Sequence, residues 1–379
     1  MAKGLYVHIP FCTSKCMYCA FYSIPVGDGD PALFDSYIDA VLKEAEMTED
    51  IVSGTKFSTI YIGGGTPTKL SPFMFRRLIL GLKETFDFED DIEFTVEANP
   101  ESLTEAFLET AVELGVNRIS LGAQYGSDEA LKYLGRLHTV KDVEKSVELI
   151  RKHGIDNINL DLIFGLPDES PETWRHTLNW AVSLAPTHIS TYSLTVEENT
   201  KLKLLVDYGS IKMPSVDRVI ELFEIREEVL SAHGFRRYEI SNFAIPGFES
   251  RHNMIYWKWQ KYLGLGASAS SFWIIDYELW RWTNLHSVKG YIERLEDGVL
   301  PKEFEESIDD NMANLERVFL GLRLSEGLDV KDRFIAQQIA DEFSEFVVAE
   351  DTRIKLTFKG MLVADHLAID IASYLENPD

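Results

Sequence analysis

Strand-like and helix-like segments alternate through the first half of the chain, and this alternation constrains the fold more than any other feature. Short apolar runs typical of strands occur at 5–9, 59–62, 92–97, 118–121, 157–163 and 188–194. Runs with apolar residues at helical spacing separate them, at 34–47, 72–86, 104–114, 128–134, 140–153 and 172–183. Six strand–helix units in succession predict an α/β fold built on a parallel sheet.

Four of the strand-like runs end in polar or glycine-rich residues instead of simple turns. These ends are Gly63–Pro67, Glu97–Pro100, Gly122–Gln124 and Asp161. Capping of the following helix explains any one of them, but it is a poor explanation of all four. Because ligands bind at the carboxyl ends of parallel strands, the pattern predicts a barrel or partial barrel with its site on that rim.

The cysteines are confined to one short segment. Cys12, Cys16 and Cys19 all lie in the run HIPFCTSKCMYCAFYS, and the rest of the chain has none. Disulfides use cysteines in pairs, and a closed tetrahedral zinc site needs four ligands. Three thiolates spaced C-x3-C-x2-C instead suit a [4Fe-4S] cluster, because they hold three irons and leave the fourth open. In radical-SAM enzymes the open iron binds S-adenosylmethionine (SAM), so the spacing predicts both cofactors.

Two other interpretations of the cysteines are weaker. His8 would complete a Cys3His zinc site, but the Ile9-Pro10 that follows it is typical of a strand end. A group of free thiols without metal is disfavoured, because free cysteines in a packed protein are normally scattered and buried. We therefore interpret the three cysteines as metal ligands.

Composition narrows the function classes. The formal net charge of −25 argues against general binding to nucleic acid or to anionic membranes, since attraction to phosphate needs a basic field. Part of the excess lies in the acidic run 303–310, which we expect to form solvated loop or helix surface. The sequence has no apolar run of the roughly 18 residues that a membrane span needs. The first strand leaves no room for a signal peptide, and unpaired cysteines fit a reducing cytoplasm.

We expect three parts along the chain. Residues 1–200 would form the barrel, and 201–299 an extension with a long helix at 215–233 and an aromatic, turn-rich stretch at 237–282. Residues 300–379 are predicted to form a small, mainly helical accessory domain of winged-helix-like type. The acidity of this last part argues against DNA binding.

Side chains near the cysteines and the strand ends are candidates for holding SAM. The rings of Tyr18 and Phe21, beside the cysteines, would shield a cluster from water. The glycines at 63–65 allow backbone to approach a small polar ligand closely. Carboxylates and amides suit the ribose and ammonium of SAM, and an arginine suits its carboxylate. The candidates of these types are Glu97, Gln124, Arg136 and Asp161, for each of which alone a surface or capping role is an equal alternative.

The stretch SRHNMIYW at 250–257 differs from the rest of the chain in its chemistry. His252 is flanked by Arg251 and followed by Tyr256 and Trp257. The histidine could ligate heme iron, the arginine could pair with a propionate, and the two aromatic rings could stack on a porphyrin. Judged from the residues alone, a histidine packed in an aromatic patch is the stronger interpretation.

Together these motifs resemble the radical-SAM family of the oxygen-independent coproporphyrinogen III dehydrogenase HemN and its relative, the heme chaperone HemW. The resemblance runs almost end to end, through YVHIPFC-x3-C-x2-C, GGGTPT, VEANP, SLGAQ, LGRLHT, DLIFGLP, YEISNFA, HNMIYW and LTFKGMLVAD. It implies a partial (β/α)6 radical-SAM barrel with a C-terminal helical domain. The family's SAM contacts would fall on Tyr6, Gly64, Gly65, Thr66, Glu97, Gln124, Arg136 and Asp161, besides the three cysteines.

Two features favour the chaperone branch of that family. The dehydrogenase has a fourth cysteine where this chain has Phe21, and an N-terminal extension where this chain begins its first strand at once. The chaperone branch has H-N-x-x-Y-W, a motif associated there with heme binding and matched here by His252, Asn253, Tyr256 and Trp257. With the resemblance, heme contact by His252 becomes the favoured interpretation.

The resemblance implies a cytoplasmic heme chaperone that holds a [4Fe-4S] cluster, SAM and heme and passes heme to respiratory acceptor proteins. Contact with a membrane surface to reach such acceptors stays open. The alternative is a radical-SAM oxidoreductase that decarboxylates coproporphyrinogen III, against which Phe21 and the absent extension count. Radical chemistry on another substrate is a third and weaker hypothesis, because only the cluster motif supports it.

Overall fold

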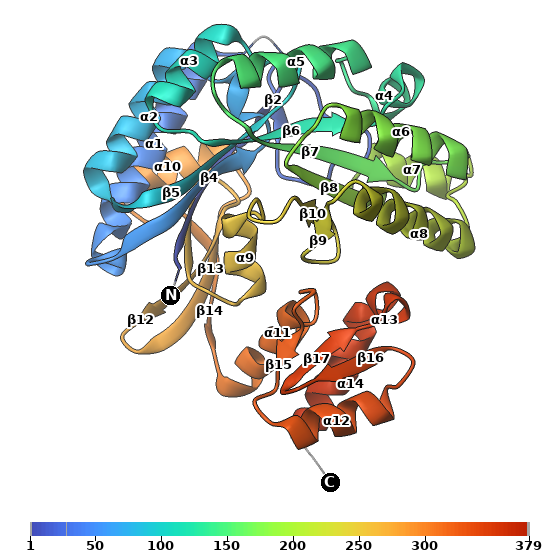
Figure 1. The fold of residues 1–379 in the computed structure, drawn as a ribbon. Coiled ribbons are helices and arrows are strands. Elements are labelled where there is room, and N and C mark those ends of the chain that lie inside the picture. Colours follow the sequence, from blue (N-terminus) through green and yellow to red (C-terminus); the bar gives the residue numbers. More distant parts are fainter. Residues whose placement is uncertain (1, 28, 377–379) are drawn as a thin grey trace.

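Six parallel strands form the centre of the fold. The computed structural model describes residues 2–27 and 29–376. In sequence order the six strands are β1 (Gly4–Ile9), β4 (Lys56–Gly64), β5 (Asp87–Ala98), β6 (Arg118–Gln124), β7 (Asn157–Phe164) and β8 (His188–Ser193). They lie side by side in this order, each parallel to the next, and confirm the predicted partial (β/α)6 barrel (Figure 1).

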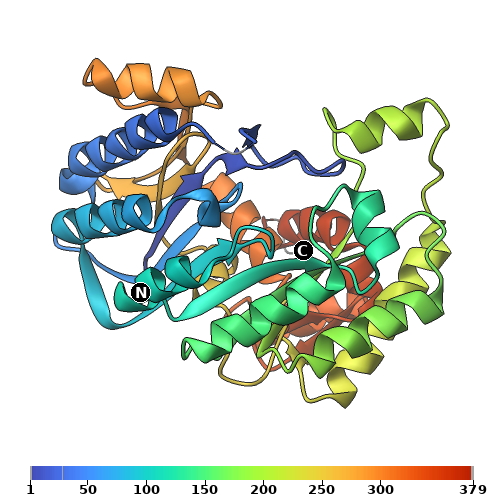
Figure 2. The ribbon, with the colours of Figure 1, turned by 90° about the horizontal axis from the view of Figure 1, so that it is seen from above.

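Helices cover the outer face of this sheet (Figures 1 and 2). They are α1 (Pro31–Thr48), α2 (Pro72–Thr85), α3 (Glu105–Glu113), α4 (Asp128–Leu134), α5 (Val140–Lys152), α6 (Pro171–Ser183) and α8 (Val216–Ala232). Helix α2 is an example: it buries an apolar stripe that includes Leu78 and Ile79. Its start is set locally, because Ser71 caps the Met74 N–H and Pro72 takes the first helical position.

The sheet continues beyond the barrel strands on both sides and has twelve strands within the described residues. Beyond β1 lie β11 (Tyr262–Leu265), β12 (Ser270–Ile275), β13 (Glu278–Asn284) and β14 (Lys302–Ile308); beyond β8 lie β10 (Asn242–Ala244) and β9 (Arg236–Arg237). The stretch expected to be turn-rich therefore supplies most of these added strands. Trp273 lies opposite Trp280 across β12 and β13, and such aromatic cross-strand pairs stabilise sheets.

The acidic run 303–310 is mostly strand, which corrects the expectation of solvated loop or helix surface. Its first residues belong to β14, the outer strand of the large sheet, which pairs with β13. Most side chains of β14 are exposed, but Ile308 is buried and Glu306 pairs with Arg281. An outer strand tolerates this charge because one of its edges has no partner strand among residues 2–27 and 29–376.

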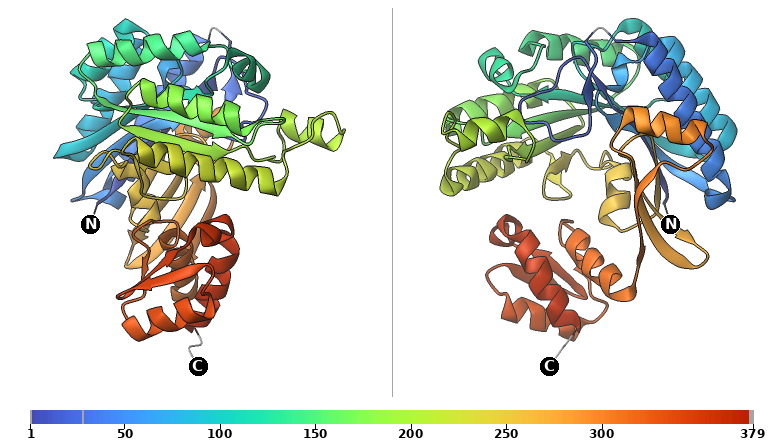
Figure 3. Two further views of the ribbon diagram at one scale, coloured as in Figure 1. Left: turned by 45° about the vertical axis from the view of Figure 1, so that its right-hand side comes forward. Right: turned by 180° about the vertical axis from the view of Figure 1, so that it is seen from behind.

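The last part of the chain, residues 310–376, forms a small C-terminal unit with its own core (Figure 3). Helices α11 (Asp310–Gly321), α12 (Arg333–Glu342), α13 (Phe358–Leu362) and α14 (Ala364–Glu376) pack with a three-stranded antiparallel sheet of β15 (Leu328–Asp329), β17 (Arg353–Leu356) and β16 (Val347–Glu350). The division of the chain at residues 200 and 300 stays a prediction. Strand β14 pairs within the large sheet, and the small core begins with residues of α11.

Short elements connect these parts. They are β2 (Phe11–Cys12), β3 (Ile24–Pro25), the 3-10 helices Glu49–Val52 and Pro67–Lys69, and helices α7 (Lys201–Asp207), α9 (Arg251–Trp257) and α10 (Val288–Glu296). Among residues 2–27 and 29–376, no helix has both the length and the apolar composition needed to cross a membrane.

Candidate cluster and cofactor site

A cavity of about 770 Å³ lies at the carboxyl ends of the barrel strands. Its lining includes Cys12, Cys16, Tyr18, Cys19, Gly64, Gly65, Thr66, Glu97, Gln124, Arg136 and Asp161. Two of the candidate residues, Tyr6 and His252, do not line it. Residues far apart in the sequence thus meet on one rim, because parallel strands bring their carboxyl ends together.

The glycine loop after β4 holds the start of the cysteine loop in place. The Gly65 N–H donates to the Ile9 carbonyl and the Thr66 N–H to the Phe11 carbonyl, each at 2.8 Å. A Cβ at position 65 would lie 2.9 Å from backbone atoms of Ile9 and Phe11. Glycine is therefore required for the close approach of β4 to strand β2, which carries Cys12.

The three thiols are free and line the same space. Thr66 Oγ1 lies 3.6 Å from Cys12 Sγ, and Arg136 Nη1 lies 3.4 Å from Cys16 Sγ. Burial raises the pKa of the Cys12 and Cys19 thiols above its usual value. Iron takes cysteine as thiolate, so a cluster bound here would release those protons. Three unpaired thiols fit the ligand set of a [4Fe-4S] cluster with one open iron.

Glu97 forms part of the cavity wall and has both carboxylate oxygens engaged. Oε1 accepts from the Tyr61 hydroxyl at 2.8 Å, and Oε2 accepts from the Gly64 N–H at 3.0 Å. Burial raises the pKa of Glu97 to about 7, and the two donors partly offset that rise. The remaining lone pairs can accept a hydrogen bond from an ammonium or hydroxyl group in the cavity.

Asp161 and Gln124 extend this polar wall. Asp161 accepts from Ser120 Oγ and from Asn159 Nδ2, each at 2.9 Å, and burial raises the pKa of its carboxyl. Gln124 has a left-handed backbone, with φ of 65°, at an irregularity in the pairing of β6 with β7. Its side-chain oxygen accepts from the Tyr18 hydroxyl at 3.1 Å, which ties the cysteine loop to the end of β6.

Two cationic residues, Lys15 and Arg136, line the cavity, and Asn99 orients Arg136. Arg136 Nη2 donates to Asn99 Oδ1 and, at 3.5 Å, to the Gly122 carbonyl. Asn99 is held in turn, because its Nδ2 donates to Thr66 Oγ1 at 2.9 Å. Arg136 Nε is buried and has no hydrogen-bond partner among the described residues. An unpaired guanidinium donor beside the thiols suits a ligand carboxylate.

Sequence reasoning missed several residues of the lining. The principal ones are Tyr61, Asn99, Ser120 and Tyr192. A signal for one of them was available: Tyr61 lies two residues before Gly63, and strand alternation places both on the same face. Phe21, expected to shield a cluster, lies at the cavity but is 72% exposed, so its ring is not packed over the thiols.

His252 lies near the amino ends of the barrel strands, does not line the cavity, and is 1% exposed. Its Nδ1 is 2.7 Å from Thr59 Oγ1, and its Nε2 is 2.8 Å from the Tyr256 hydroxyl. Both ring nitrogens are therefore engaged, so ligation of iron requires that one of these hydrogen bonds be replaced. Tyr6 is a neighbour, with its ring centroid 6.5 Å from that of His252 and its hydroxyl 2.9 Å from His8 Nδ1.

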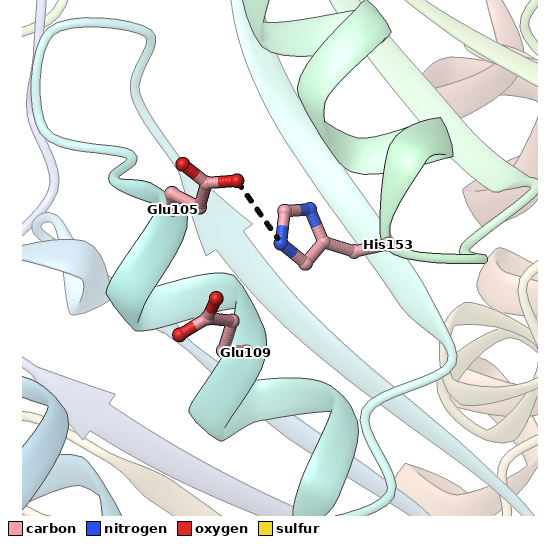
Figure 4. Close-up of side chains that lie close together, drawn as sticks. All are labelled: Glu105, Glu109 and His153. Carbon is pink, nitrogen blue, oxygen red and sulfur yellow. Dashed lines mark ion pairs between the residues drawn. The ribbon is translucent and has the colours of Figure 1, made fainter.

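A second group of metal-type side chains lies on the surface (Figure 4). Glu105 and Glu109 of α3 approach His153, which follows α5, with ligand atoms within 4.8 Å of one another. Both glutamates are exposed, and Glu105 already pairs with Lys152 at 2.5 Å. None of these residues lines the cavity, and we assign them no part in the site.

Proteins of similar sequence are known. The sequence model of the radical SAM superfamily matches residues 6–181. The chain is 34% identical over 382 residues to the heme chaperone HemW of Lactococcus lactis subsp. lactis (strain IL1403), with 96% of each chain covered. It is 38% identical over 330 residues to the heme chaperone HemW of Bacillus subtilis (strain 168), with 87% of this chain and 85% of the relative covered.

A solved structure has the same fold. Coproporphyrinogen III oxidase (HemN) from Escherichia coli, a radical SAM enzyme, matches with a TM-score of 0.80 over 98% of this chain and 90% of its own. The two sequences are 23% identical, so the likeness supports the fold, a partial barrel followed by a C-terminal unit.

Proposed function

Because the chain belongs to the family of the heme chaperone HemW, we propose that it binds heme, passes it to respiratory acceptor proteins, and holds a [4Fe-4S] cluster and SAM. The arrangement of the cavity carries the proposal. Three free thiols, an arginine nitrogen without a partner among the described residues, and the carboxylates of Glu97 and Asp161 meet at the carboxyl ends of the barrel strands. When bound, a cluster with one open iron chelates SAM and can supply an electron to its sulfonium.

In this proposal Cys12, Cys16 and Cys19 hold the cluster, and the rest of the rim holds SAM. The SAM residues are Tyr6, Gly64, Gly65, Thr66, Glu97, Gln124, Arg136 and Asp161, and the Tyr18 ring would shield the cluster. The two carboxylates suit the ammonium and ribose hydroxyls, and the guanidinium suits the carboxylate. Tyr6 does not line the cavity, so its part would be indirect, through His8 and the strand that leads to Cys12.

We place heme at the segment 252–257, with His252 as the candidate iron ligand. Trp257 supports this placement, because its Nε1 is buried and has no partner among the described residues. Such a donor suits a propionate. The Arg323 guanidinium of the C-terminal unit lies 4.9 Å from the Trp257 ring, so a cation is also at hand. Ligation would displace Thr59 or Tyr256 from His252, and we therefore expect heme binding to shift the His252 side chain.

We place the protein in the cytoplasm, because free thiols and an iron–sulfur cluster persist in a reducing compartment. A net charge of −25 disfavours nucleic acid as a partner. Heme and heme-accepting proteins remain the proposed partners, and contact with a membrane surface would serve only to reach them.

An anaerobic heme titration of the cluster-reconstituted protein, followed by the Soret band, tests the proposal. Wild type is compared with His252→Ala and with His233→Ala, which removes an exposed histidine at the end of α8. We expect saturable binding in wild type and His233→Ala, and clearly weaker binding in His252→Ala. Absence of saturable binding in wild type would contradict the chaperone function. Formation of protoporphyrinogen from coproporphyrinogen III with SAM and reductant would establish the oxidoreductase instead.

A further inference from the structure

The segment that carries His252 is anchored inside the barrel. The N–H groups of Arg251 and His252 donate to the two carboxylate oxygens of Glu93, at 2.8 and 2.9 Å. Glu93 lies on β5 and is 5% exposed. A buried carboxylate is costly unless its hydrogen bonds are made, so both donors must stay in place. The start of α9 is therefore fixed to an inward-facing side chain of the barrel.

The His252 ring is held on several sides. Thr59 and Tyr256 engage its two nitrogens, and the Tyr61 ring stacks on it, with centroids 5.1 Å apart and 28° between the planes. Gly4 of β1 makes room for it, because a Cβ there would lie 3.0 Å from the ring. The surroundings thus fit an imidazole in one orientation.

Tyr61 connects this ring to the cavity wall. One part of Tyr61 stacks on His252, and its hydroxyl donates to Glu97 Oε1 at 2.8 Å. Thr59 and Tyr61 are two residues apart on β4, and Glu93 and Glu97 are four apart on β5, so each pair shares the inward face of its strand. Contacts therefore run without a break from His252 through Tyr61 to Glu97.

We propose that His252 is a positioning residue of the SAM cavity: by packing against Tyr61 it fixes the hydroxyl that orients the Glu97 carboxylate. The inference rests on the SAM-binding part of the proposed function. It gives the H-N-x-x-Y-W segment a task that is separate from heme contact. Among the described residues, the only other donor to Glu97 is the Gly64 N–H, on the opposite oxygen, so the orientation of Oε1 depends on Tyr61.

Loss of the His252 ring has a clear physical consequence. Thr59 and Tyr256 would each lose a buried partner, and Tyr61 would lose the surface that holds its rotamer. The Glu97 carboxylate would then be less well ordered before SAM binds. Because ordering it on binding costs free energy, the affinity for SAM would fall. The three cysteines are not touched, so the cluster itself should still assemble.

The test measures SAM affinity of the cluster-reconstituted full-length protein, under anaerobic conditions, by equilibrium dialysis with radiolabelled SAM. Tyr61→Phe removes the hydroxyl that donates to Glu97 and keeps the ring. Tyr291→Phe is its matched control, because the Tyr291 hydroxyl likewise donates to a glutamate, the buried Glu44, and neither residue lines the cavity. His252→Ala removes the stacking partner, and His252→Phe puts a ring back in its place.

We expect Tyr61→Phe and His252→Ala to weaken SAM binding about tenfold, the effect of losing one hydrogen bond to a charged group. His252→Phe should recover part of that loss, and Tyr291→Phe should bind SAM within about twofold of wild type. The electron paramagnetic resonance spectrum of the reduced cluster gives a second readout. Addition of SAM should change this spectrum, and the same change should require a higher SAM concentration in Tyr61→Phe and His252→Ala than in wild type. The iron content of these variants should equal that of wild type.

Wild-type SAM affinity in both His252→Ala and Tyr61→Phe would overturn the inference, as would an equal loss of affinity in Tyr291→Phe. If His252→Ala fails to fold, Tyr61→Phe and its control decide the matter, since each removes a single hydroxyl. Absence of SAM binding by wild type would refute the SAM-binding part of the proposed function along with the inference. The heme titration is independent of all these outcomes.

Discussion

At the scale of single residues, Gly65 positions the cysteine loop by having no side chain. Alanine there would place its Cβ 2.9 Å from three backbone atoms of Ile9 and Phe11, which cannot move aside as a flexible side chain can. We expect Gly65→Ala to lower the free energy of unfolding by about 2 kcal/mol and to reduce the iron bound after reconstitution. Urea denaturation and iron analysis measure these effects.

The matched control for that variant is Gly290→Ala in α10. A Cβ at position 290 would meet mainly the side chain of Ser287, at 3.3 Å. Alanine in a helix is generally more stable than glycine by about 0.5–1 kcal/mol, so Gly290→Ala should leave stability unchanged or raise it. Equal losses in the two variants would show that the close approach at Gly65 is not the cause.

The pH dependence of stability reports on His252. Burial lowers the pKa of its ring to about 3, from 6.5 for an ordinary histidine. Between these values the unfolded chain binds more protons at this site, so stability is lost as the pH falls below 6.5. We expect the free energy of unfolding to fall more steeply in wild type than in His252→Ala, by up to about 1.4 kcal/mol per pH unit. Urea denaturation from pH 6.5 to 4.5 would give parallel curves if the ring were accessible to protons.

The sequence predicts the residues that line the cavity better than it predicts the surroundings of His252. Cys12, Cys16 and Cys19 have a local spacing that specifies their chemistry, and polar strand ends such as Glu97 follow a rule of parallel sheets. His252 depends on Thr59, 193 positions away, and on Glu93, and no local pattern shows such pairings. Its aromatic surroundings indicated packing, but they did not indicate which residues it packs against.

At the scale of secondary-structure elements, buried Glu44 joins α1 to the strands beyond β1. It accepts from the Gly266 N–H after β11 at 2.8 Å, from Asn284 Nδ2 at the end of β13 at 2.6 Å, and from the Tyr291 hydroxyl on α10. Glu44→Ala would leave the Gly266 N–H and the Tyr291 hydroxyl without an acceptor, and Asn284 Nδ2 would keep only the Gly266 carbonyl. We expect it to lower the free energy of unfolding by about 3–5 kcal/mol, measured by urea denaturation.

Glu46→Ala is the control for this network, since Glu46 lies on the same helix and is exposed. Its stability should stay within about 0.5 kcal/mol of wild type. A loss in Glu44→Ala no larger than that in Glu46→Ala would mean that water or another acceptor replaces the carboxylate.

Helices were easier to predict than the added strands. Apolar periodicity and capping residues such as Ser71 are local, so α2 begins where the sequence indicates. Strands β12 to β14 are antiparallel and partly exposed, and aromatic and acidic residues hid their alternation. The outer strand β14 is stable because β13 pairs with it, a contact that the composition of 303–310 does not reveal.

At the scale of the whole molecule, the two roles of His252 compete. If heme iron takes a nitrogen of His252, the ring must leave Thr59 or Tyr256, and the support of Tyr61 and Glu97 weakens. We therefore expect heme to weaken SAM binding about tenfold, and SAM to weaken heme binding by the same factor, because coupling between sites is reciprocal.

Two titrations measure this coupling: heme binding with and without saturating SAM, and SAM binding with and without heme. His252→Ala is the control, since any heme that it still binds should be indifferent to SAM. Independent binding, or mutual strengthening, would show that the heme site does not draw on the His252 ring.

The large sheet does not close on itself within the part of the chain that the structure describes, and its two outermost strands there are β14 and β9. Charged side chains protect the outer edge of β14. The C-terminal unit covers the chain beside β9, where the Ser325 N–H donates to the Tyr238 carbonyl at 2.9 Å and Glu239 forms a bridge with Leu324. Exposed strand edges recruit strands from other molecules. A chain cut before α11 would therefore keep its cavity and yet aggregate, because the C-terminal unit also keeps neighbouring copies from adding to the sheet.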